Sequence, residues 1–198
     1  VQGEAPPERL AADAAQWARE LRAAGVTLDV ATVADVVPAD VGARNRPIGA
    51  LRRGYGSDPA SVSASVRAFV AGMTGAGVAT TLKHFPGLGT VTGNTDFTAD
   101  VVDTRTTRAD PLLAPFAAGI AEGVPLVMLS LSTYSAIDAE NLAAFSPVVI
   151  QSMLRGDLGF AGVVISDDLG IAAAVRTVPP AERALRFLRA GGDVVLTV

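Results

Sequence analysis

Apolar residues along the chain recur in two alternating patterns, one at helical spacing and one in short continuous runs. The spaced residues predict helices, and the runs predict strands buried on both faces. Helices are expected over residues 6–24, 59–73, 111–121, 147–155 and 179–190. Strands are expected over residues 26–37, 78–82, 125–131, 161–166 and 193–198. Glycine-rich segments over 38–58 and 83–110 are expected to form long loops. This alternation predicts an α/β fold with a parallel sheet and right-handed crossovers.

Polar residues gather where the predicted strands end, at Asp35, at the Lys83–His84 pair and over 166–168. A (β/α)8 barrel of the TIM type places its active site at that face of the sheet. An open doubly wound sheet binds ligands at the same place, so this pattern alone leaves both folds open. Five strands are predicted, whereas a full barrel has eight. We therefore expect that N-terminal strands are missing, and that a longer precursor exists because the chain opens on VQGEAPPERL without Met.

The composition restricts the class of protein. A chain of 198 residues with 49% hydrophobic and 18% charged residues is expected to form one folded domain. Its net charge of −4 argues against a nucleic-acid partner, and no apolar run reaches the roughly 20 residues that a membrane span needs. With no cysteine and one histidine, we expect no disulfide framework, no zinc cluster and no cofactor.

The only lysine, Lys83, stands next to the only histidine, His84, at the start of TLKHFPGLGTVTGNTDF. Lys83 precedes the glycines and no Gly-Lys-Ser/Thr follows, so this is not a phosphate-binding Walker loop, and the glycine spacing does not fit the dinucleotide fingerprint. The pair offers donors suited to neutral hydroxyls or a developing negative charge. The plainer alternative is that Lys83 anchors a loop by a salt bridge and that the backbone satisfies His84.

The segment VVISDDLG (163–170) places two carboxylates at the end of an apolar strand. Strand alternation puts Asp167 on the same side as Val163 and Ile165, and Asp168 on the other side. A carboxylate in this position can serve as a nucleophile, a general base or a metal ligand. The alternative is that both aspartates only cap the following helix.

Together, KHFPGLG, GNTDF, VVISDDLG and AGGDVVLTV resemble motifs of glycoside hydrolase family 3, in its β-N-acetylglucosaminidase branch. The resemblance covers the chain from about residue 19 to its end. It implies that residues 1–198 form an incomplete catalytic barrel domain. It further implies a retaining exo-β-glycosidase that hydrolyses terminal β-N-acetylglucosamine from cell-wall-derived glycans.

The resemblance also implies roles for particular residues. Asp167 matches the nucleophile that forms the covalent glycosyl-enzyme intermediate. Lys83 and His84 match a pair that binds sugar hydroxyls, and Arg53 matches a substrate-binding arginine. Asp168 is then a neighbour that supports Asp167 rather than a catalytic group.

The chain departs from the family at the acid/base. Relatives carry an Asp-x-His pair on the loop after KHFPG, and this chain has Asn94 and Asp96 there. The second histidine of the family's KHFPGHG is Leu88. We expect Asp96 to replace the histidine as general acid, because a desolvated carboxyl has a raised pKa. Asn94 would be its uncharged hydrogen-bond partner.

Two other functions stay open at this point. One is a catalytically impaired carbohydrate-binding relative in the cell envelope. The other is unrelated barrel chemistry, such as an aldolase that forms a Schiff base on Lys83. Family members with this arginine-rich texture are often exported or lipid-anchored, so we expect an envelope location, and a cytoplasmic one is the alternative.

Overall fold

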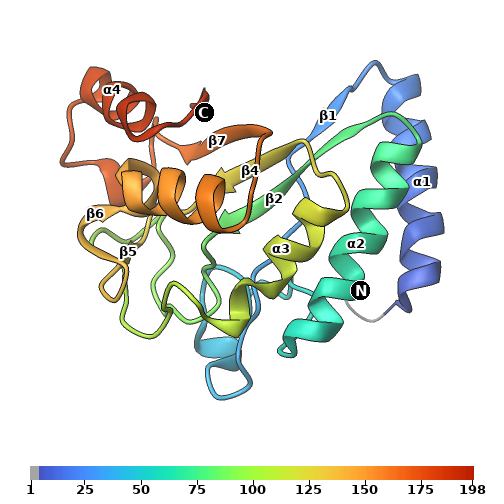
Figure 1. Cartoon of the computed structure of the whole chain (residues 1–198), viewed down its shortest axis with the longest axis horizontal. Helices are drawn as coiled ribbons and strands as arrows, with labels where there is room; N and C mark the ends of the chain where they lie inside the picture. The colour runs from blue at the N-terminus through green and yellow to red at the C-terminus, as the bar shows by residue number, and fades with distance from the viewer. Residues whose placement is uncertain (1–4) are drawn as a thin grey trace.

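The computed structural model describes residues 5–198 as an α/β structure built on a parallel sheet (Figure 1). The strands of this sheet follow chain order: β1 (Leu28–Asp29), β2 (Ala79–Phe85), β4 (Leu126–Leu129), β7 (Val163–Asp168) and β8 (Val194–Leu196). Each strand is parallel to the next, with Leu126 opposite both Thr81 and Val163. The carboxyl ends of the strands therefore lie at one edge of the sheet.

The sheet curls into an open half-barrel. Side chains on its concave face form one apolar cluster of Leu126, Met128 and Ile165. Val30, from the β1 edge, and Leu196, from the β8 edge, both pack against this cluster. Two opposite edges can meet the same central residues only when the sheet is strongly curved, as it is in barrels. The expected TIM-barrel-like α/β fold is thus confirmed, with five parallel strands in the described part of the chain.

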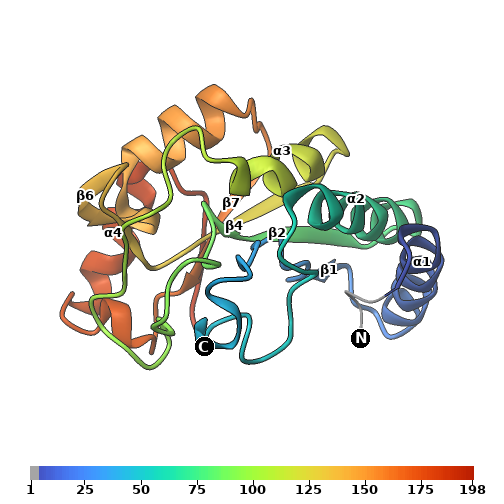
Figure 2. The same ribbon diagram turned by 90° about the horizontal axis from the view of Figure 1, so that it is seen from below.

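Helices cover the convex face and connect the strands. They are α1 (Pro7–Ala23), α2 (Pro59–Gly75), α3 (Ala114–Ala121), the π-helical segment η5 (Val148–Asp157) and α4 (Pro180–Ala190). Figure 2 shows α2 and α3 together on one side of the sheet, with α1 beside α2 at the β1 end. The side chain of Asp58 caps α2 by accepting the Ser61 amide at 2.8 Å, with Pro59 at the first helical position.

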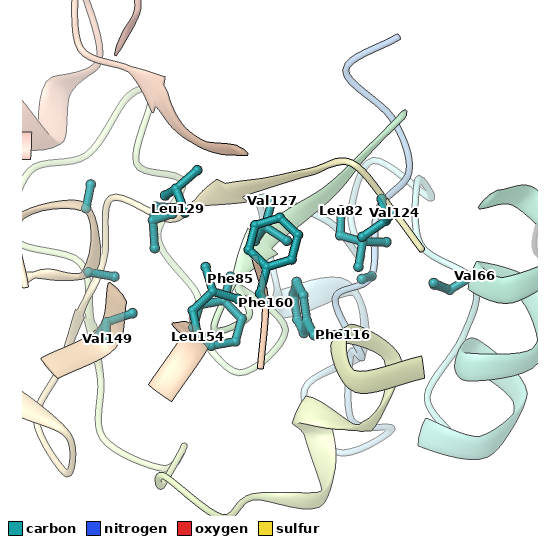
Figure 3. Packing of buried hydrophobic residues seen from close by; sticks show 14 of the residues in the cluster. Val66, Leu82, Phe85, Phe116, Val124, Val127, Leu129, Val149, Leu154 and Phe160 are labelled. Carbon is teal, nitrogen blue, oxygen red and sulfur yellow. The ribbon is translucent and has the colours of Figure 1, made fainter. Parts of the chain in front are cut away.

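The main core lies between the convex face of the sheet and these helices. Figure 3 shows Leu82 and Phe85 of β2 and Val127 of β4 pointing toward Phe116 of α3. The rings of Phe85 and Phe116 meet edge to face, with centroids 5.2 Å apart. This packing fixes the strand that carries Lys83 and His84.

A second, small sheet lies outside the half-barrel and was not predicted. It consists of β3 (Val102–Asp103), β5 (Thr133–Tyr134) and β6 (Asp138–Leu142). Short 3₁₀ turns complete the elements: η2 (Gly42–Arg44), η3 (Pro111–Leu113), η4 (Ala143–Phe145) and η6 (Ala173–Val175). The strand β6 is exposed and polar in sequence, so it carries none of the apolar signal that predicts strands.

Two of the strand predictions differ from the structure in ways that affect the site. The strand expected over 26–37 is reduced to Leu28–Asp29 and a single bridge between Val33 and Lys83. The later apolar residues Val33 and Val37 pack instead into a second cluster under the loops, which explains their hydrophobicity without a strand. Conversely, β2 continues to Phe85, so Lys83 and His84 belong to the strand rather than to the following loop.

Candidate active site

A cavity of ≈190 Å³ opens at the carboxyl ends of the strands. It is smaller than the roughly 300–1,000 Å³ of pockets that hold drug-sized ligands, so it suits one small polar ring. Its lining includes most of the sequence-predicted site residues: Arg53, Lys83, His84, Asn94, Asp96 and Asp167. These residues come from four separate parts of the chain, and the half-barrel brings them together.

Two larger cavities lie elsewhere and lack this concentration of charge. One, of ≈410 Å³, is formed within the loop from Val37 to Ser57, with Arg52 as the charged residue in its lining. Another, of ≈400 Å³, lies between α1, α2 and the β1 edge and is mostly apolar. Neither combines carboxylates with cations at the strand ends, so we place the candidate site in the smaller cavity.

Lys83 and His84 both face the cavity although they are neighbours in a strand. Regular alternation would direct them to opposite faces. The pairing of β2 with β4 shifts register between Leu82 and Phe85, and this irregularity turns both side chains toward the cavity. Burial, followed by the nearby Arg53, lowers the pKa of Lys83 against the opposing influence of Asp167.

Asp35 holds His84 from below the cavity. Its carboxylate is fully buried and lies 2.8 Å from Nδ1 of His84. It also accepts the backbone amides of His84 at 3.2 Å and Leu88 at 2.7 Å. Burial alone would raise the pKa of Asp35, but His84 and these donors outweigh it and hold the pKa below its ordinary value. With Nδ1 occupied, Nε2 of His84 is the ring nitrogen left for the cavity.

The two aspartates at the end of β7 have different surroundings. Asp167 is half-buried and faces the cavity, on the side of Ile165, as alternation predicts. Asp168 faces away and accepts the amides of Gly170 at 2.7 Å, Val198 at 3.2 Å and Ile171 at 3.3 Å. Asp168 therefore fixes the turn after the strand, while the Asp167 carboxylate accepts the Asp168 amide at 2.9 Å and faces the cavity.

The loop after β2 brings Asp96 to the mouth of the cavity. The side chain of Asn94 accepts the Asp96 amide at 2.9 Å, which forms a tight turn. Partial burial, followed by the carboxylate of Asp167, raises the pKa of Asp96, while Arg53 and His84 oppose this. Asp96 is nevertheless exposed rather than enclosed, so a bound ligand would be needed to desolvate it fully.

Asn45 joins the two loops that frame the cavity, and sequence reasoning missed it. Its amide nitrogen donates to the carbonyls of Leu88 at 2.6 Å and Val91 at 2.7 Å. Its side-chain oxygen accepts the amides of Ile48 at 2.9 Å and Gly49 at 2.8 Å. A lone asparagine in a polar loop gives no sequence signal for this role. By contrast, Asp35 stood out at a strand end, although no role was assigned to it.

Arg53 reaches the cavity from the first of these loops. Its Nε donates to the carbonyl of Pro47 at 2.8 Å, which orients the guanidinium.

Within residues 5–198, no group of three or more His, Asp or Glu side chains is arranged to hold a metal ion. Over the same range, no helix has the length and apolarity needed to cross a bilayer. The site thus presents two carboxylates and two cations around a ring-sized cavity.

Comparison with known proteins shows to which family the chain is similar. Residues 4–198 match the model of the glycosyl hydrolase family 3 N-terminal domain. A beta-hexosaminidase of Xanthomonas oryzae pv. oryzae is 42% identical over 98% of this chain and 57% of its own length. One from Stenotrophomonas maltophilia is 45% identical over 90% of this chain and 51% of its own length. The chain thus spans about half the length of these curated relatives.

Solved structures agree with the sequence relatives. A crystal structure of a beta-N-acetylhexosaminidase from Beutenbergia cavernae superposes with a TM-score of 0.97, at 47% identity, over 100% of this chain and 59% of that one. A family 3 beta-N-acetylglucosaminidase from a Paenibacillus species superposes with a TM-score of 0.85, at 32% identity, over 97% of this chain and 36% of that one. On these grounds the chain belongs to glycosyl hydrolase family 3, and the part it contains is the family's N-terminal domain.

Proposed function

We propose that this chain carries the catalytic centre of a retaining exo-β-glycosidase that removes terminal β-N-acetylglucosamine from cell-wall-derived glycans. The observation that carries the proposal is the convergence of Asp167 and Asp96 on one ring-sized cavity, where partial burial and then the charge of Asp167 raise the pKa of Asp96. Most retaining glycosidases use one ionised carboxylate and one protonated carboxyl. The relatives' activity on N-acetylhexosamine supports the choice of sugar.

In the first step, the Asp167 carboxylate attacks the anomeric carbon while Asp96 donates its proton to the glycosidic oxygen. The bond between sugar and leaving group breaks, and a glycosyl ester forms on Asp167. In the second step, Asp96 takes a proton from a water molecule, which attacks the same carbon and displaces Asp167. Each step inverts the anomeric centre, so the β configuration is retained. This mechanism needs the two carboxyls to approach within about 5–5.5 Å when a sugar is bound.

The cations and His84 would hold the sugar ring. Arg53 and Lys83 offer N–H donors to hydroxyl oxygens, and the Nε2 of His84 is presented by its bond to Asp35. A sugar that fills the cavity also expels water from around Asp96. Desolvation favours the protonated carboxyl, so substrate binding would raise the pKa of Asp96 further and prepare it as the acid.

A direct test is the Asp167→Asn variant, assayed on a β-N-acetylglucosaminide with a good leaving group. We expect turnover to fall by at least about 10⁴-fold, because the amide cannot form the ester. Asp13→Asn, in α1 and far from the cavity, is the matched control and should behave as wild type. Full turnover by Asp167→Asn would show that the nucleophile is assigned wrongly.

The alternative function is a catalytically impaired sugar-binding protein of the cell envelope. It is favoured by the replacement of the family's Asp-x-His pair by Asn94 and Asp96. It predicts binding of N-acetylglucosamine by calorimetry without turnover of any substrate. The double variant Asn94→Asp with Asp96→His discriminates, since turnover that appears only in this variant would mean that the natural chain lacks its acid.

A further inference from the structure

Arg183 is a buried guanidinium that binds backbone oxygens. It lies in α4, with 7% of its surface exposed. Its Nε donates to the carbonyl of Val178 at 2.7 Å. Its Nη1 donates to the carbonyls of Leu169 at 2.8 Å and Gly170 at 2.6 Å. The ion pairs among residues 5–198 do not include it. Since a buried charge is costly unless it is satisfied, these carbonyls are its partners.

The three carbonyls mark the two ends of one segment, residues 169–178. This segment begins directly after the Asp167–Asp168 pair and returns to α4. The turn η6 lies in its middle. One guanidinium thus ties both ends of the segment to the same helix, and leaves η6 at a fixed place beside the cavity.

The loop that carries Asp96 rests on η6. The Ala173 amide donates to the carbonyl of Asp96 at 3.1 Å, and the Ala174 amide donates to the carbonyl of Thr95 at 3.1 Å. Thr95 is almost fully buried, whereas the neighbouring Phe97 is 83% exposed. The loop therefore contacts the β7 side of the site at its backbone, directly at the residue assigned as the acid.

We propose that Arg183 is a positioning residue that sets the place of Asp96 through η6. The proposal rests on the function proposed above for Asp96. Asp167 does not depend on this route, because it stands in a strand paired with β4 and β8. Loss of Arg183 should thus weaken proton donation and leave the nucleophile in place.

The test uses Arg183→Met, which keeps length but removes all donors, and Arg183→Lys, which keeps one charge but cannot span the three carbonyls. Arg186→Met, on the same helix and exposed, is the matched control. Each is assayed on two β-N-acetylglucosaminides, one with a dinitrophenyl leaving group, which needs no acid, and one with an alkyl leaving group, which does.

We expect Arg183→Met to lower kcat/KM on the alkyl glycoside by about 10²-fold, a large part of what a general acid contributes. Its kcat/KM on the dinitrophenyl glycoside should stay near wild type. On the alkyl glycoside, the kcat/KM of Arg183→Lys should lie between those of wild type and Arg183→Met. Arg186→Met should match wild type on both. An equal loss on both substrates, or no loss on either, would overturn the proposal. If Arg183→Met does not fold, the same two criteria apply to Arg183→Lys.

Hydrogen exchange separates this proposal from the proposed function. Arg183→Met should speed exchange of the Ala173 and Ala174 amides by at least about tenfold, while the amides of β7 keep their protection. Unchanged exchange at Ala173 and Ala174 would overturn the role of Arg183 even in an active enzyme. If wild type shows no turnover but the Ala173 and Ala174 amides exchange faster in Arg183→Met, the glycosidase proposal is contradicted. The structural role of Arg183 in holding η6 would still stand.

Discussion

Asp167 and Asp96 reach the same cavity from structures of different strength. Asp167 lies near the end of β7, a strand that pairs with neighbours on both sides and backs onto the main core. Asp96 stands on a loop that is held near its tip by the Asn94 turn and by two backbone bonds to η6. Segments with few buried contacts open more easily than core strands. In the proposed mechanism, the nucleophile Asp167 is therefore fixed by strand pairing, whereas the acid Asp96 is held by fewer contacts.

This difference has a chemical rationale. The nucleophile must attack one carbon along one line, so a rigid support helps it. The acid must leave room for the sugar ring to enter the cavity and then approach the glycosidic oxygen. A side chain on a loop can make this movement more readily than one on a strand. Changes on the loop side should therefore alter proton transfer, and changes on the strand side should alter bond formation or stability.

Among changes outside β7, the largest effect should come from Asp96→Ala. We expect a 10²–10⁴-fold loss on a glycoside with an alkyl leaving group, about the full contribution of a general acid. The rate of the first step, formation of the glycosyl-enzyme, should fall much less on a dinitrophenyl glycoside. Steady-state and burst kinetics would measure this rate on each of the two substrates.

The control for this prediction is Thr92→Ala, an exposed position on the same loop. It should behave as wild type on both substrates. If Asp96→Ala lowers kcat/KM equally on the two substrates, Asp96 supports the site rather than donating a proton.

A smaller effect, on stability, should come from Asp35→Asn. The variant weakens the bond to His84, so we expect the free energy of unfolding at neutral pH to fall by about 1–3 kcal/mol. The folded pKa of Asp35 is below its ordinary value of about 3.9. Its stabilisation is therefore present above that pH and is lost as the pH falls through the folded pKa.

Urea unfolding of wild type and Asp35→Asn between pH 7 and 3 checks the sign. The gap between the two proteins should narrow on acidification. A gap that is constant, or that widens toward low pH, would contradict the assigned pairing of Asp35 with His84.

The smallest effect should come from Asn94→Asp. The new carboxylate keeps an acceptor for the Asp96 amide and adds a negative charge beside Asp96. Like charge raises a carboxyl pKa, so the alkaline limb of the kcat/KM profile, where Asp96 loses its proton, should move to higher pH. A limb that stays in place or moves to lower pH would mean that Asp96 does not set it.

The sequence predicted the strand side of the site better than the loop side. Apolar runs ending in Lys83–His84 and Asp167–Asp168 mark strand ends, and parallel strands must bring those ends together. The motifs also indicated Arg53 and Asp96. Pattern alone could not show that β2 shifts register at Lys83, nor that the run over 26–37 mostly packs beneath the loops.

The supporting contacts were beyond sequence reasoning for a physical reason. Asn45 binds Leu88 and Val91 across more than forty positions, and Arg183 binds carbonyls rather than charged side chains. Backbone carbonyls exist at every residue, so such contacts leave no trace in residue type. They become visible only when the fold places the segments side by side.

The most direct test of the account is to trap the glycosyl-enzyme intermediate. A slow fluorinated β-N-acetylglucosaminide with a good leaving group is incubated with the chain, and the peptide between Arg155 and Arg176 is sequenced by mass spectrometry. The account predicts one sugar per chain, attached at Asp167 and not at Asp168, in wild type and in Asp96→Ala alike. Turnover without an adduct, or a sugar attached at any other residue, would contradict it.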